Sequence, residues 1–263
     1  MKPLQMIYRK NSGKIFCLFT AIVFLTSCRP AVQGNSETPK EDTTKLQSFI
    51  RDSLAKTDSL ELHFYFPENA CVSLVSERPL RSDTSVVFAC AAAFTLLEND
   101  GIDGLFIENG SIMSKHVNHS LGGGVLIYPD SMKKNPLIFG TEMGQILDSF
   151  FIDSVCAMKA SFYQEIQMVR EGEALVFRKD VSRFQRRALC VWNGRVAVVE
   201  SSAPCTLQEF ANALKNMGIR NAIYCDGGSW DEGWFRDETG VVHAIGLMRN
   251  QTARQSNWLI FHQ

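Results

Sequence analysis

The chain has 263 residues, of which 45% are hydrophobic and 21% charged, and its formal net charge is −1. This near-neutral balance gives no general basic field, so nucleic acid is not expected as a partner. The apolar content suffices for a sizeable core, and no internal repeat is visible in the sequence.

The first 28 residues have the pattern of a secretion signal. Four basic residues precede the apolar run Ile15–Leu25, which is short for a membrane span. The segment ends in Leu25-Thr26-Ser27-Cys28, which resembles the lipobox of bacterial lipoproteins, in which the cysteine is lipidated. We therefore predict a signal peptide over residues 1–28 and a lipid anchor on Cys28 that holds the protein in the cell envelope, facing the periplasm or the exterior. An ordinary signal peptide with a coincidental cysteine is the alternative.

Residues 29–46 are polar and rich in Pro, Ser, Thr and Glu. A segment of this composition cannot bury a core, so we predict a flexible tether. The remaining residues, 47–263, are numerous enough for one sizeable domain rather than two.

The predicted domain begins with Ser48–Lys56, which we interpret as a short amphipathic helix. Apolar runs bounded by turn residues then predict strands, in chain order, over Glu61–Phe66, Ala70–Val75, Ser85–Phe94, Ala174–Phe177 and Trp258–Phe261. The run Ser85–Phe94 contains small and apolar residues throughout, which is typical of a strand buried on both faces. Gly122-Gly123-Gly124 marks a loop that enters a further strand and is a weak signal for a phosphate loop.

Tight turns predict three hairpins. Asn109-Gly110 lies within Leu105–Ile112, and Asn193-Gly194 lies between two alternating apolar runs. Trp234–Phe235 and Val241–Ile245 are expected to pair through the turn between them. Many short strands and few helices predict an α+β fold, a single domain with a mainly antiparallel mixed sheet and a few packed helices.

A capped helix follows the second hairpin. Thr206 and Glu209 have the spacing of a capping box, and Gly218 marks the end of the helix. The apolar residues between them follow helical spacing: Leu207, Phe210, Ala211, Leu214 and Met217.

The short strand Asn221–Cys225 delivers Asp226 to its C-terminal end. Gly227 and Gly228 then allow backbone or ligand to approach closely. Asp226 is the leading candidate for a functional carboxylate. The alternative is an aspartate that accepts hydrogen bonds from neighbouring amides and fixes the turn.

Six cysteines remain once Cys17 and Cys28 are set aside: Cys71, Cys90, Cys156, Cys190, Cys205 and Cys225. Several lie in apolar, strand-like runs, so we expect mostly free, buried thiols. The sequence has no C-x-x-C motif, and His116 and His119 lack an obvious third ligand. No metal and no cofactor are therefore predicted.

The order and spacing of these motifs resemble the phosphodiester glycosidase family, which includes the mannose 6-phosphate uncovering enzyme and bacterial relatives. The resemblance runs from about Val86 to Ile245 and is strongest over Arg186–Gly228. That part is similar to the family's Arg-x-Ala-x-Gly strand, to its helix with a Thr-Leu-x-Glu start and to its closing Asp-Gly-Gly. Upstream, residues 88–114 (FACAAAFTLLENDGIDGLFIENGSIMS) are similar to the family's first block.

The resemblance implies a hydrolase that cleaves a sugar-1-phosphodiester or related glycan linkage, with a glycan or sugar phosphate as substrate. It implies Asp226 and Arg186 as the catalytic pair, with Arg186 on the phosphate. The residues implied or considered for substrate binding are Gly227, Gly228, Arg187, Gln164 and Trp230. If Arg186 and Arg187 lie on a strand, they point to opposite faces, and Arg186 matches the family better. The alternative is a pair of surface arginines that follows the charged loop Arg178–Arg183. Trp230 and Trp234 flank the acidic loop and suit either sugar stacking or packing.

The sequence departs from the family pattern at several polar positions. Ala91 and Ala93 replace an asparagine and a glycine of the first block, and Cys190 replaces the later glycine of the arginine strand. An alanine side chain cannot donate the hydrogen bond of an amide. The alternative function is therefore a degenerate, non-catalytic glycan- or peptidoglycan-binding lipoprotein on the same scaffold.

Three further side chains are open candidates for the site. Asp231 or Glu232 can supply a second carboxylate, or both can be solvated loop residues. His243 suits either a general acid or an ordinary residue of an edge strand, and the sequence does not decide between them.

Overall fold

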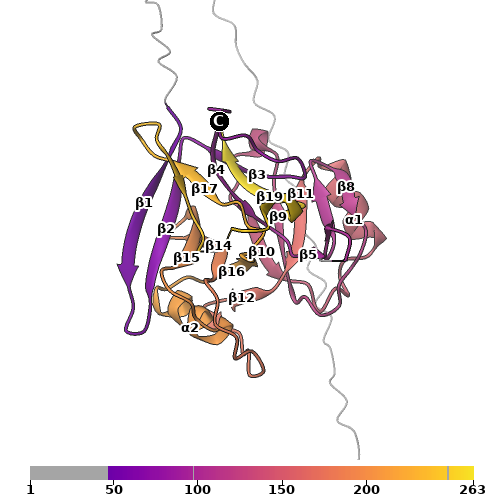
Figure 1. The fold of residues 1–263 in the computed structure, drawn as a ribbon. Helices are drawn as coiled ribbons and strands as arrows, with labels where there is room; N and C mark the ends of the chain where they lie inside the picture. Colours follow the sequence, from indigo (N-terminus) through magenta and orange to yellow (C-terminus); the bar gives the residue numbers. More distant parts are fainter. Residues whose placement is uncertain (1–46, 97, 248) are drawn as a thin grey trace, which may run out of the picture. The chain divides into compact units, whose positions relative to one another are not determined.

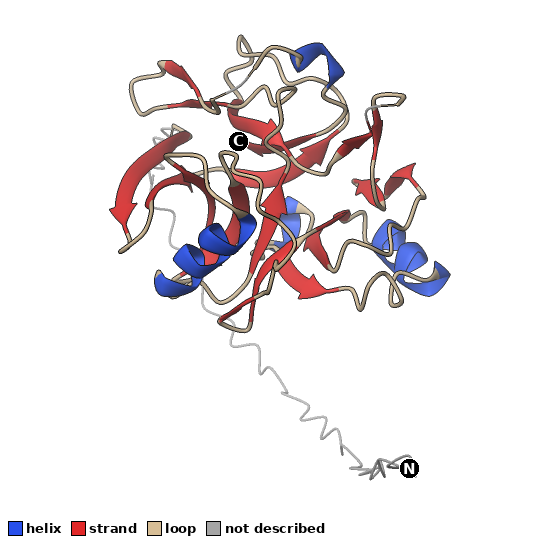
Figure 2. Cartoon of the chain, turned by 60° about the horizontal axis from the view of Figure 1, so that its bottom comes forward, coloured by secondary structure: helices blue, strands red, loops and turns tan. Residues whose placement is uncertain are grey.

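The structure, a computed structural model, describes residues 47–96, 98–247 and 249–263. Antiparallel strand pairing dominates this part of the chain. Its strands form three larger sheets and one two-stranded sheet, with antiparallel pairing between neighbouring strands, and two α-helices accompany them (Figures 1 and 2). The described part is therefore α+β with mainly antiparallel sheets. The predicted signal peptide, Cys28 and the tether fall on residues 1–46, outside the described residues.

The largest sheet has seven strands in the order β1-β2-β15-β14-β16-β12-β13. Its strands are β1 (Phe49–Lys56), β2 (Glu61–Glu68), β12 (Gln167–Arg170), β13 (Glu173–Ala174), β14 (Arg187–Trp192), β15 (Arg195–Ser201) and β16 (Ala222–Cys225). The predicted hairpin at Asn193-Gly194 is confirmed, because it joins β14 and β15 with φ angles of 50° and 77°. Positive φ at both central residues is the requirement of a type I′ turn.

A five-stranded sheet has the order β10-β9-β11-β7-β8. Its strands are β7 (Phe106–Glu108), β8 (Ser111–Ser114), β9 (Gly123–Ile127), β10 (Leu137–Gly140) and β11 (Ser161–Glu165). Asn109-Gly110 joins β7 and β8, which confirms that hairpin. Gly124 serves close packing within β9, because a Cβ there would lie 2.6 Å from the ring of Phe162.

The other five-stranded sheet has the order β18-β17-β4-β19-β3. Its strands are β3 (Cys71–Val75), β4 (Val86–Ala91), β17 (Trp234–Arg236), β18 (Val242–Ala244) and β19 (Trp258–His262). Every residue of β4 is buried, as its composition predicts, and β17 pairs with β18 as expected. The two-stranded sheet joins β5 (Thr95–Leu96) to β6 (Gly101–Ile102).

The helix α2 (Leu207–Asn216) begins at the predicted cap. Thr206 and Glu209 form both hydrogen bonds of a capping box, and Gly218 follows the helix with φ of 75°. The helix α1 (Ser149–Ala157), with Asp148 as its N-cap, is an element that the sequence analysis did not predict. Short 3₁₀ turns cover Asp130–Met132 and Thr252–Arg254. Among the described residues, neither helix has the length and apolar composition that crossing a membrane requires.

The central core lies between the three larger sheets. Tyr65 of β2 contacts Phe88 of β4 and Phe235 of β17, with ring centroids 5.6 and 5.3 Å apart. Val125 of β9 and other buried residues of the remaining sheet belong to the same apolar cluster. One continuous core therefore holds the three sheets together.

The two helices cover outer faces of two sheets. Phe210 and Leu214 of α2 belong to a second cluster with Ala188 and Ala222 of the seven-stranded sheet. Val155 of α1 packs in a third cluster that contains residues of β9 and β11. Each helix thus buries the face of a sheet that the central core leaves uncovered.

Two sequence-based expectations need correction. Ser48–Lys56 is not a helix, because residues 49–56 form β1, an edge strand that pairs along its whole length with β2. The strand predicted over Ala174–Phe177 is reduced to β13. For Trp234 the sequence left sugar stacking and packing open, and the structure shows packing, because the side chain is 1% exposed.

Candidate active site

The register of β14 and β16 brings Asp226 and Arg186 to the same end of these two neighbouring strands of the seven-stranded sheet. In this antiparallel pair Arg187 lies opposite Cys225, so the residue before β14 and the residue after β16 are neighbours. Because side chains alternate along an extended segment, Arg186 and Arg187 point to opposite faces. Two residues far apart in sequence are thereby placed side by side.

Asp226 is a nearly buried carboxylate held by three donors. Its Oδ2 accepts hydrogen bonds from Thr95 N at 3.2 Å and Trp230 Nε1 at 2.5 Å, and its Oδ1 accepts one from Gly228 N at 3.3 Å. Burial raises the pKa of Asp226 from 3.8 to about 6, although the hydrogen bonds from Trp230 and Thr95 lower it. The group therefore changes its protonation state close to neutral pH.

The Arg186 guanidinium is held by acceptors on its Nε and Nη2 sides. Nε donates to Cys205 O at 3.1 Å, and Nη2 donates to Ser182 O at 2.8 Å and Asp180 Oδ2 at 3.0 Å. Nη1 donates to the Tyr224 hydroxyl at 3.4 Å, the longest of these contacts. Because Nη1 carries two N–H groups, it has the capacity to donate to an anion as well.

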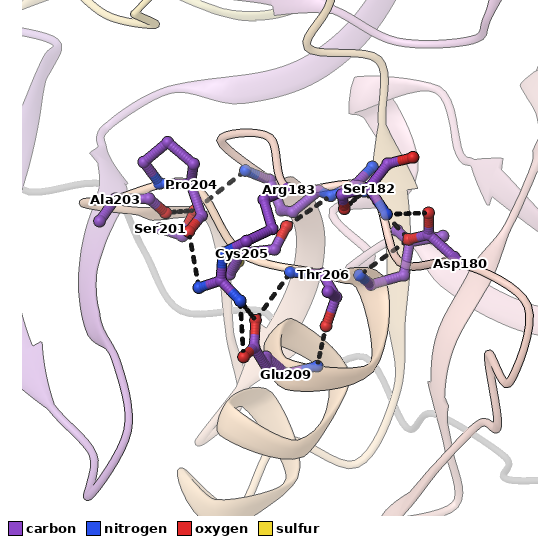
Figure 3. A network of polar contacts seen from close by, with 11 residues as sticks. Asp180, Ser182, Arg183, Ser201, Ala203, Pro204, Cys205, Thr206 and Glu209 are labelled. Carbon is purple, nitrogen blue, oxygen red and sulfur yellow. Dashed lines mark hydrogen bonds and ion pairs between the residues drawn. The ribbon is translucent and has the colours of Figure 1, made fainter.

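The loop that carries Asp180 is fixed to the start of α2 (Figure 3). Asp180 Oδ2 also accepts the first N–H of the helix, at 3.1 Å. Arg183 Nη1 donates to both carboxylate oxygens of Glu209, at 2.9 and 2.8 Å. Glu209 in turn accepts Thr206 N at 2.8 Å. The predicted helix cap therefore also positions the loop beside the candidate site.

A cavity of about 570 Å³ lies at this end of β14 and β16. It is lined by Phe94, Thr95, Asp103, Arg183, Phe184, Gln185, Arg186, Pro204, Tyr224, Asp226, Gly227, Gly228, Ser229, Trp230 and Leu247. Five of the predicted site residues thus meet here: Asp226, Arg186, Gly227, Gly228 and Trp230. Half of the remaining lining residues are aromatic or aliphatic, and the others include two further charged residues, Asp103 and Arg183.

Gly228 and Trp230 depend on each other sterically. A Cβ at Gly228 would lie 2.4 Å from the Trp230 ring, so this position requires glycine. At Gly227 the nearest neighbour of such a Cβ is Gln185 O at 3.6 Å, an ordinary contact. Of the two glycines, Gly228 is the one that lets the indole reach Asp226.

Arg187 lies on the opposite face and forms a buried ion triad. Its Nε donates to Glu200 Oε2 at 2.8 Å and its Nη1 to Asp231 Oδ2 at 2.7 Å. Arg187 and both carboxylates are almost completely buried, and none of them lines the cavity. Glu232, the other candidate for a second carboxylate, pairs with Arg78 Nη1 at 2.5 Å. The structure brings none of these groups into the cavity.

Gln164 is a fully buried connector between β11 and the loop before β9. Its Oε1 accepts Asn118 N at 3.1 Å and Leu105 N at 3.3 Å, while its Nε2 donates to Asn118 O at 2.7 Å and Leu121 O at 3.1 Å. These bonds use the capacity of its amide donors and acceptors toward backbone groups. A role of Gln164 in substrate binding would require its side chain in the cavity wall. In the structure Gln164 does not line the cavity.

Glu165 is a buried acid that the sequence analysis missed. It is 0% exposed, and its carboxylate accepts Ile166 N at 2.8 Å and Phe94 N at 3.0 Å. Burial raises its pKa well above the ordinary value, and the negative charge of Asp226 adds to this effect. The signal available in the sequence was an acid inside the strand-like run SFYQEIQMV.

Side-chain acceptors hold the segment from Ala91 to Thr95 along the site. Asp231 Oδ1 accepts Ala91 N at 3.0 Å, and Asn257 Oδ1 accepts Ala93 N at 2.8 Å. Glu165 and Asp226 bind the next two amides, those of Phe94 and Thr95. Ala91 and Ala93 themselves are fully buried, and the side chains that reach the cavity from this segment are those of residues 94 and 95.

The histidines considered from the sequence lie outside the cavity. His119 Nδ1 is 2.8 Å from Met143 O, and His116 Nε2 is 3.5 Å from Asp103 Oδ1. His243 Nε2 is 2.6 Å from Asp237 Oδ2 beside a turn. Across residues 47–96, 98–247 and 249–263, no group of three or more His, Cys, Asp or Glu side chains has the geometry to hold a metal ion.

The six cysteines of the described domain are free thiols. The buried ones are Cys90, Cys190, Cys205 and Cys225, whereas Cys71 is exposed and Cys156 is half-buried. Burial raises the pKa of Cys190, which disfavours the reactive thiolate.

A larger cavity, of about 760 Å³, lies elsewhere, where residues of β3 and β19 meet Tyr128 and Asp130. Ser73 Oγ and His262 Nε2 are 2.8 Å apart in its wall. Neither Asp226 nor Arg186 lines this cavity. The smaller cavity is therefore the better candidate for an active site.

Sequence comparison finds no matching family profile and no matching curated protein. Among solved structures, the chain is similar to "Zebrafish N-acetylglucosamine-1-phosphodiester alpha-N-acetylglucosaminidase (NAGPA) catalytic domain auto-inhibited by pro-peptide", with a TM-score of 0.56, 16% identity, and coverage of 82% of this chain and 83% of that one. It is also similar to a hypothetical protein from Synechocystis, with a TM-score of 0.54, 12% identity, and coverage of 82% of this chain and 62% of that one. The described chain thus shares the fold of a phosphodiester glycosidase catalytic domain, at an identity that shows the fold alone.

Proposed function

We propose that the protein is a hydrolase of the phosphodiester glycosidase family that cleaves a sugar-1-phosphodiester or related glycan linkage. The observation that carries this proposal is the meeting of Asp226 and Arg186 in one cavity of about 570 Å³. Both side chains line the same cavity, and a carboxylate and a guanidinium match the two charges that such a reaction develops. The shared fold adds support.

In the proposed reaction the bond between the anomeric carbon and the phosphate oxygen breaks. The bonding electron pair stays on the phosphate oxygen, so a phosphate monoester leaves, and water gives its hydroxyl to the anomeric carbon and releases one proton. The carboxylate of Asp226 stabilises the positive charge on the sugar or attacks the anomeric carbon. Nη1 of Arg186 donates to the departing phosphate. A phosphate monoester is a good leaving group, so little general-acid assistance is required.

Substitution of Asp226 tests this assignment. Asp226→Asn removes the charge while it retains an oxygen that accepts from Thr95 and Trp230. We expect kcat on a sugar-1-phosphodiester to fall by roughly 100-fold or more, the scale of losing one preorganised electrostatic group. Asp153→Asn, an exposed carboxylate on α1, is the matched control. Equal rates for wild type and Asp226→Asn, with intact circular dichroism, would remove Asp226 from the mechanism.

The pH dependence of the rate distinguishes the roles of Asp226. The pKa of about 6 means that the carboxylate form, which the proposed role requires, becomes dominant as pH rises through that value. We therefore expect kcat/KM to rise between pH 5 and 7. A rate that falls across this range would indicate a general acid in place of a charged stabiliser.

The second candidate function is a non-catalytic glycan-binding protein. Its specific support is that both oxygens of Asp226, and Nε and Nη2 of Arg186, already have protein partners. In that case a sugar-1-phosphate would bind the protein with similar Kd before and after Asp226→Asn, and wild type would show no turnover. Calorimetry combined with product analysis separates the two functions.

We also propose that the protein is anchored in the cell envelope by a lipid on Cys28. The supporting observation is the basic, apolar and lipobox-like order of residues 1–28. Cys28→Ala should move the full-length protein from the membrane fraction to the soluble fraction when it is expressed in a bacterium. Unchanged membrane association would contradict the anchor.

A further inference from the structure

The cavity has an apolar rim on the side of Arg186. Phe184 lines the cavity and is 52% exposed, and its ring lies against the Arg186 guanidinium at 5.3 Å. Pro204 lines the same wall and is exposed. Large exposed apolar side chains next to a site mark places where a ligand or partner removes them from water.

The loop that precedes Phe184 carries further exposed apolar side chains. Val176 and Val181 are 65% and 81% exposed. Residues 176–184 read VFRKDVSRF and contain four apolar, three basic and one acidic side chain. The acid, Asp180, is engaged with Arg186 and α2. The loop therefore offers positive charge and apolar area together, which suits an anionic amphiphile.

The order of groups along the cavity agrees with the order of groups in such a ligand. Trp230 contacts Asp226, and Phe184 contacts Arg186. A sugar over Trp230 places the anomeric carbon at Asp226 and the phosphate at Arg186. The alcohol on the far side of the phosphate then lies against Phe184.

We propose that the alcohol esterified to the phosphate is a long aliphatic chain, so that the substrate class is a sugar-1-phosphodiester of a lipid-like alcohol. This inference rests on the proposed function and specifies its substrate. A polar alcohol would leave the exposed Phe184 and Pro204 side chains of the cavity rim in water, whereas an aliphatic chain covers them.

A chain-length series tests the proposal. Hexose-1-phosphate diesters of methanol and of hexanol, both kept below micelle-forming concentrations, are compared for kcat/KM. We expect the hexyl diester to be favoured by about tenfold or more, less than complete burial of the added methylenes would give, because the rim is half exposed. Phe184→Ser should reduce this preference severalfold, and Phe184→Leu should largely retain it. Phe150→Ser removes a 79% exposed phenylalanine on α1 and should leave the preference unchanged.

A titration with the monoester products separates this inference from the proposed function. Hexyl phosphate should bind about tenfold more tightly than methyl phosphate, with the difference reduced in Phe184→Ser. If the diesters are hydrolysed at rates independent of chain length, the aliphatic substrate is refuted while the hydrolase stands. If no diester is hydrolysed, the proposed function fails, and equal binding of the two monoesters would refute the amphiphile site as well.

Discussion

At the scale of single residues, burial and hydrogen bonding act in opposite directions on the carboxyl group of Asp226. Burial raises its pKa from 3.8 to about 6, and hydrogen bonds from Trp230 and Thr95 lower it. A raised pKa means that the folded state binds the proton more tightly than the unfolded state. The stability gained in this way is fully present below pH 3.8 and is lost as pH rises through about 6.

This linkage predicts a pH-dependent effect of Asp226→Asn on stability. The change in pKa corresponds to on the order of 3 kcal/mol. Asparagine stays neutral, so the variant does not lose this contribution as pH rises. The free energy of unfolding of the variant minus that of wild type should therefore increase between pH 4 and 7. Urea unfolding at several pH values measures this difference. A difference between Asp226→Asn and wild type that does not change with pH would contradict the raised pKa.

Arg187 shows how much depends on a buried charge that has no place in the cavity. Replacing it by methionine leaves Glu200 and Asp231 without their cation in the interior. Removing one member of a buried ion cluster typically costs about 3–5 kcal/mol. We expect a loss of this size for Arg187→Met in urea unfolding. Lys215→Met breaks the exposed pair with Glu173 and should lower the free energy of unfolding by less than about 1 kcal/mol. Similar losses for both variants would show that the buried triad contributes no more to stability than an exposed ion pair.

At the scale of elements, the loop after β16 is the part of the site that a small change disturbs most selectively. Gly228→Ala forces a Cβ toward the Trp230 ring, at 2.4 Å in the present geometry, whereas Gly227→Ala meets its nearest neighbour at 3.6 Å. We expect Gly228→Ala to displace the indole from Asp226 and to weaken sugar-phosphate binding by at least about tenfold, the scale of one charge-assisted hydrogen bond.

Gly227→Ala is the matched comparison for that experiment and should weaken binding less than Gly228→Ala, because its Cβ meets no atom closer than 3.6 Å. Calorimetry gives the Kd, and the tryptophan fluorescence of the two variants reports the displacement of Trp230. If both alanine variants bind the sugar phosphate with equal Kd, the absence of a side chain at Gly228 is not what positions Trp230 for binding.

Local signals in the sequence were sufficient for the elements that local chemistry determines. The Asn-Gly hairpins and the Thr206 cap follow from turn geometry and orphan amides at a helix start, which act within a few residues. The edge strand β1 was misread, because Ile50 is its one buried large side chain and the rest of its pattern fits a helix equally well. Its pairing with β2 decides its conformation.

The site residues that belong to a local sequence motif could be predicted. Those whose position depends on packing between distant segments could not. Asp226, Gly228 and Trp230 lie within a few residues of one another, and strand register adds Arg186. Glu165 has no motif, because its environment comes from Phe94 and Ile166 and from the burial of β11. The inward position of Gln164 likewise depends on a loop 46 residues away in sequence.

At the scale of the described domain, stability depends on contacts between sheets. Phe88 of β4 is fully buried and contacts Tyr65 of the seven-stranded sheet and Phe261 of β19, with ring centroids 5.6 and 5.2 Å apart. The order of strands within each sheet joins segments from distant parts of the sequence. The interior therefore forms only when the sheets come together, and its loss should affect all of them.

Phe88→Ala tests this dependence between sheets. Removing a buried phenylalanine typically costs about 3–5 kcal/mol, from lost transfer free energy and the cavity that remains. We expect the Tm to fall and the far-ultraviolet and near-ultraviolet circular dichroism to change in one coincident transition, because a shared core couples the sheets. Leu80→Ala, at a side chain that is 63% exposed, should change the free energy of unfolding by less than about 0.5 kcal/mol. Two separate transitions in Phe88→Ala would mean that the sheet containing β4 unfolds independently of the sheet that presents Asp226.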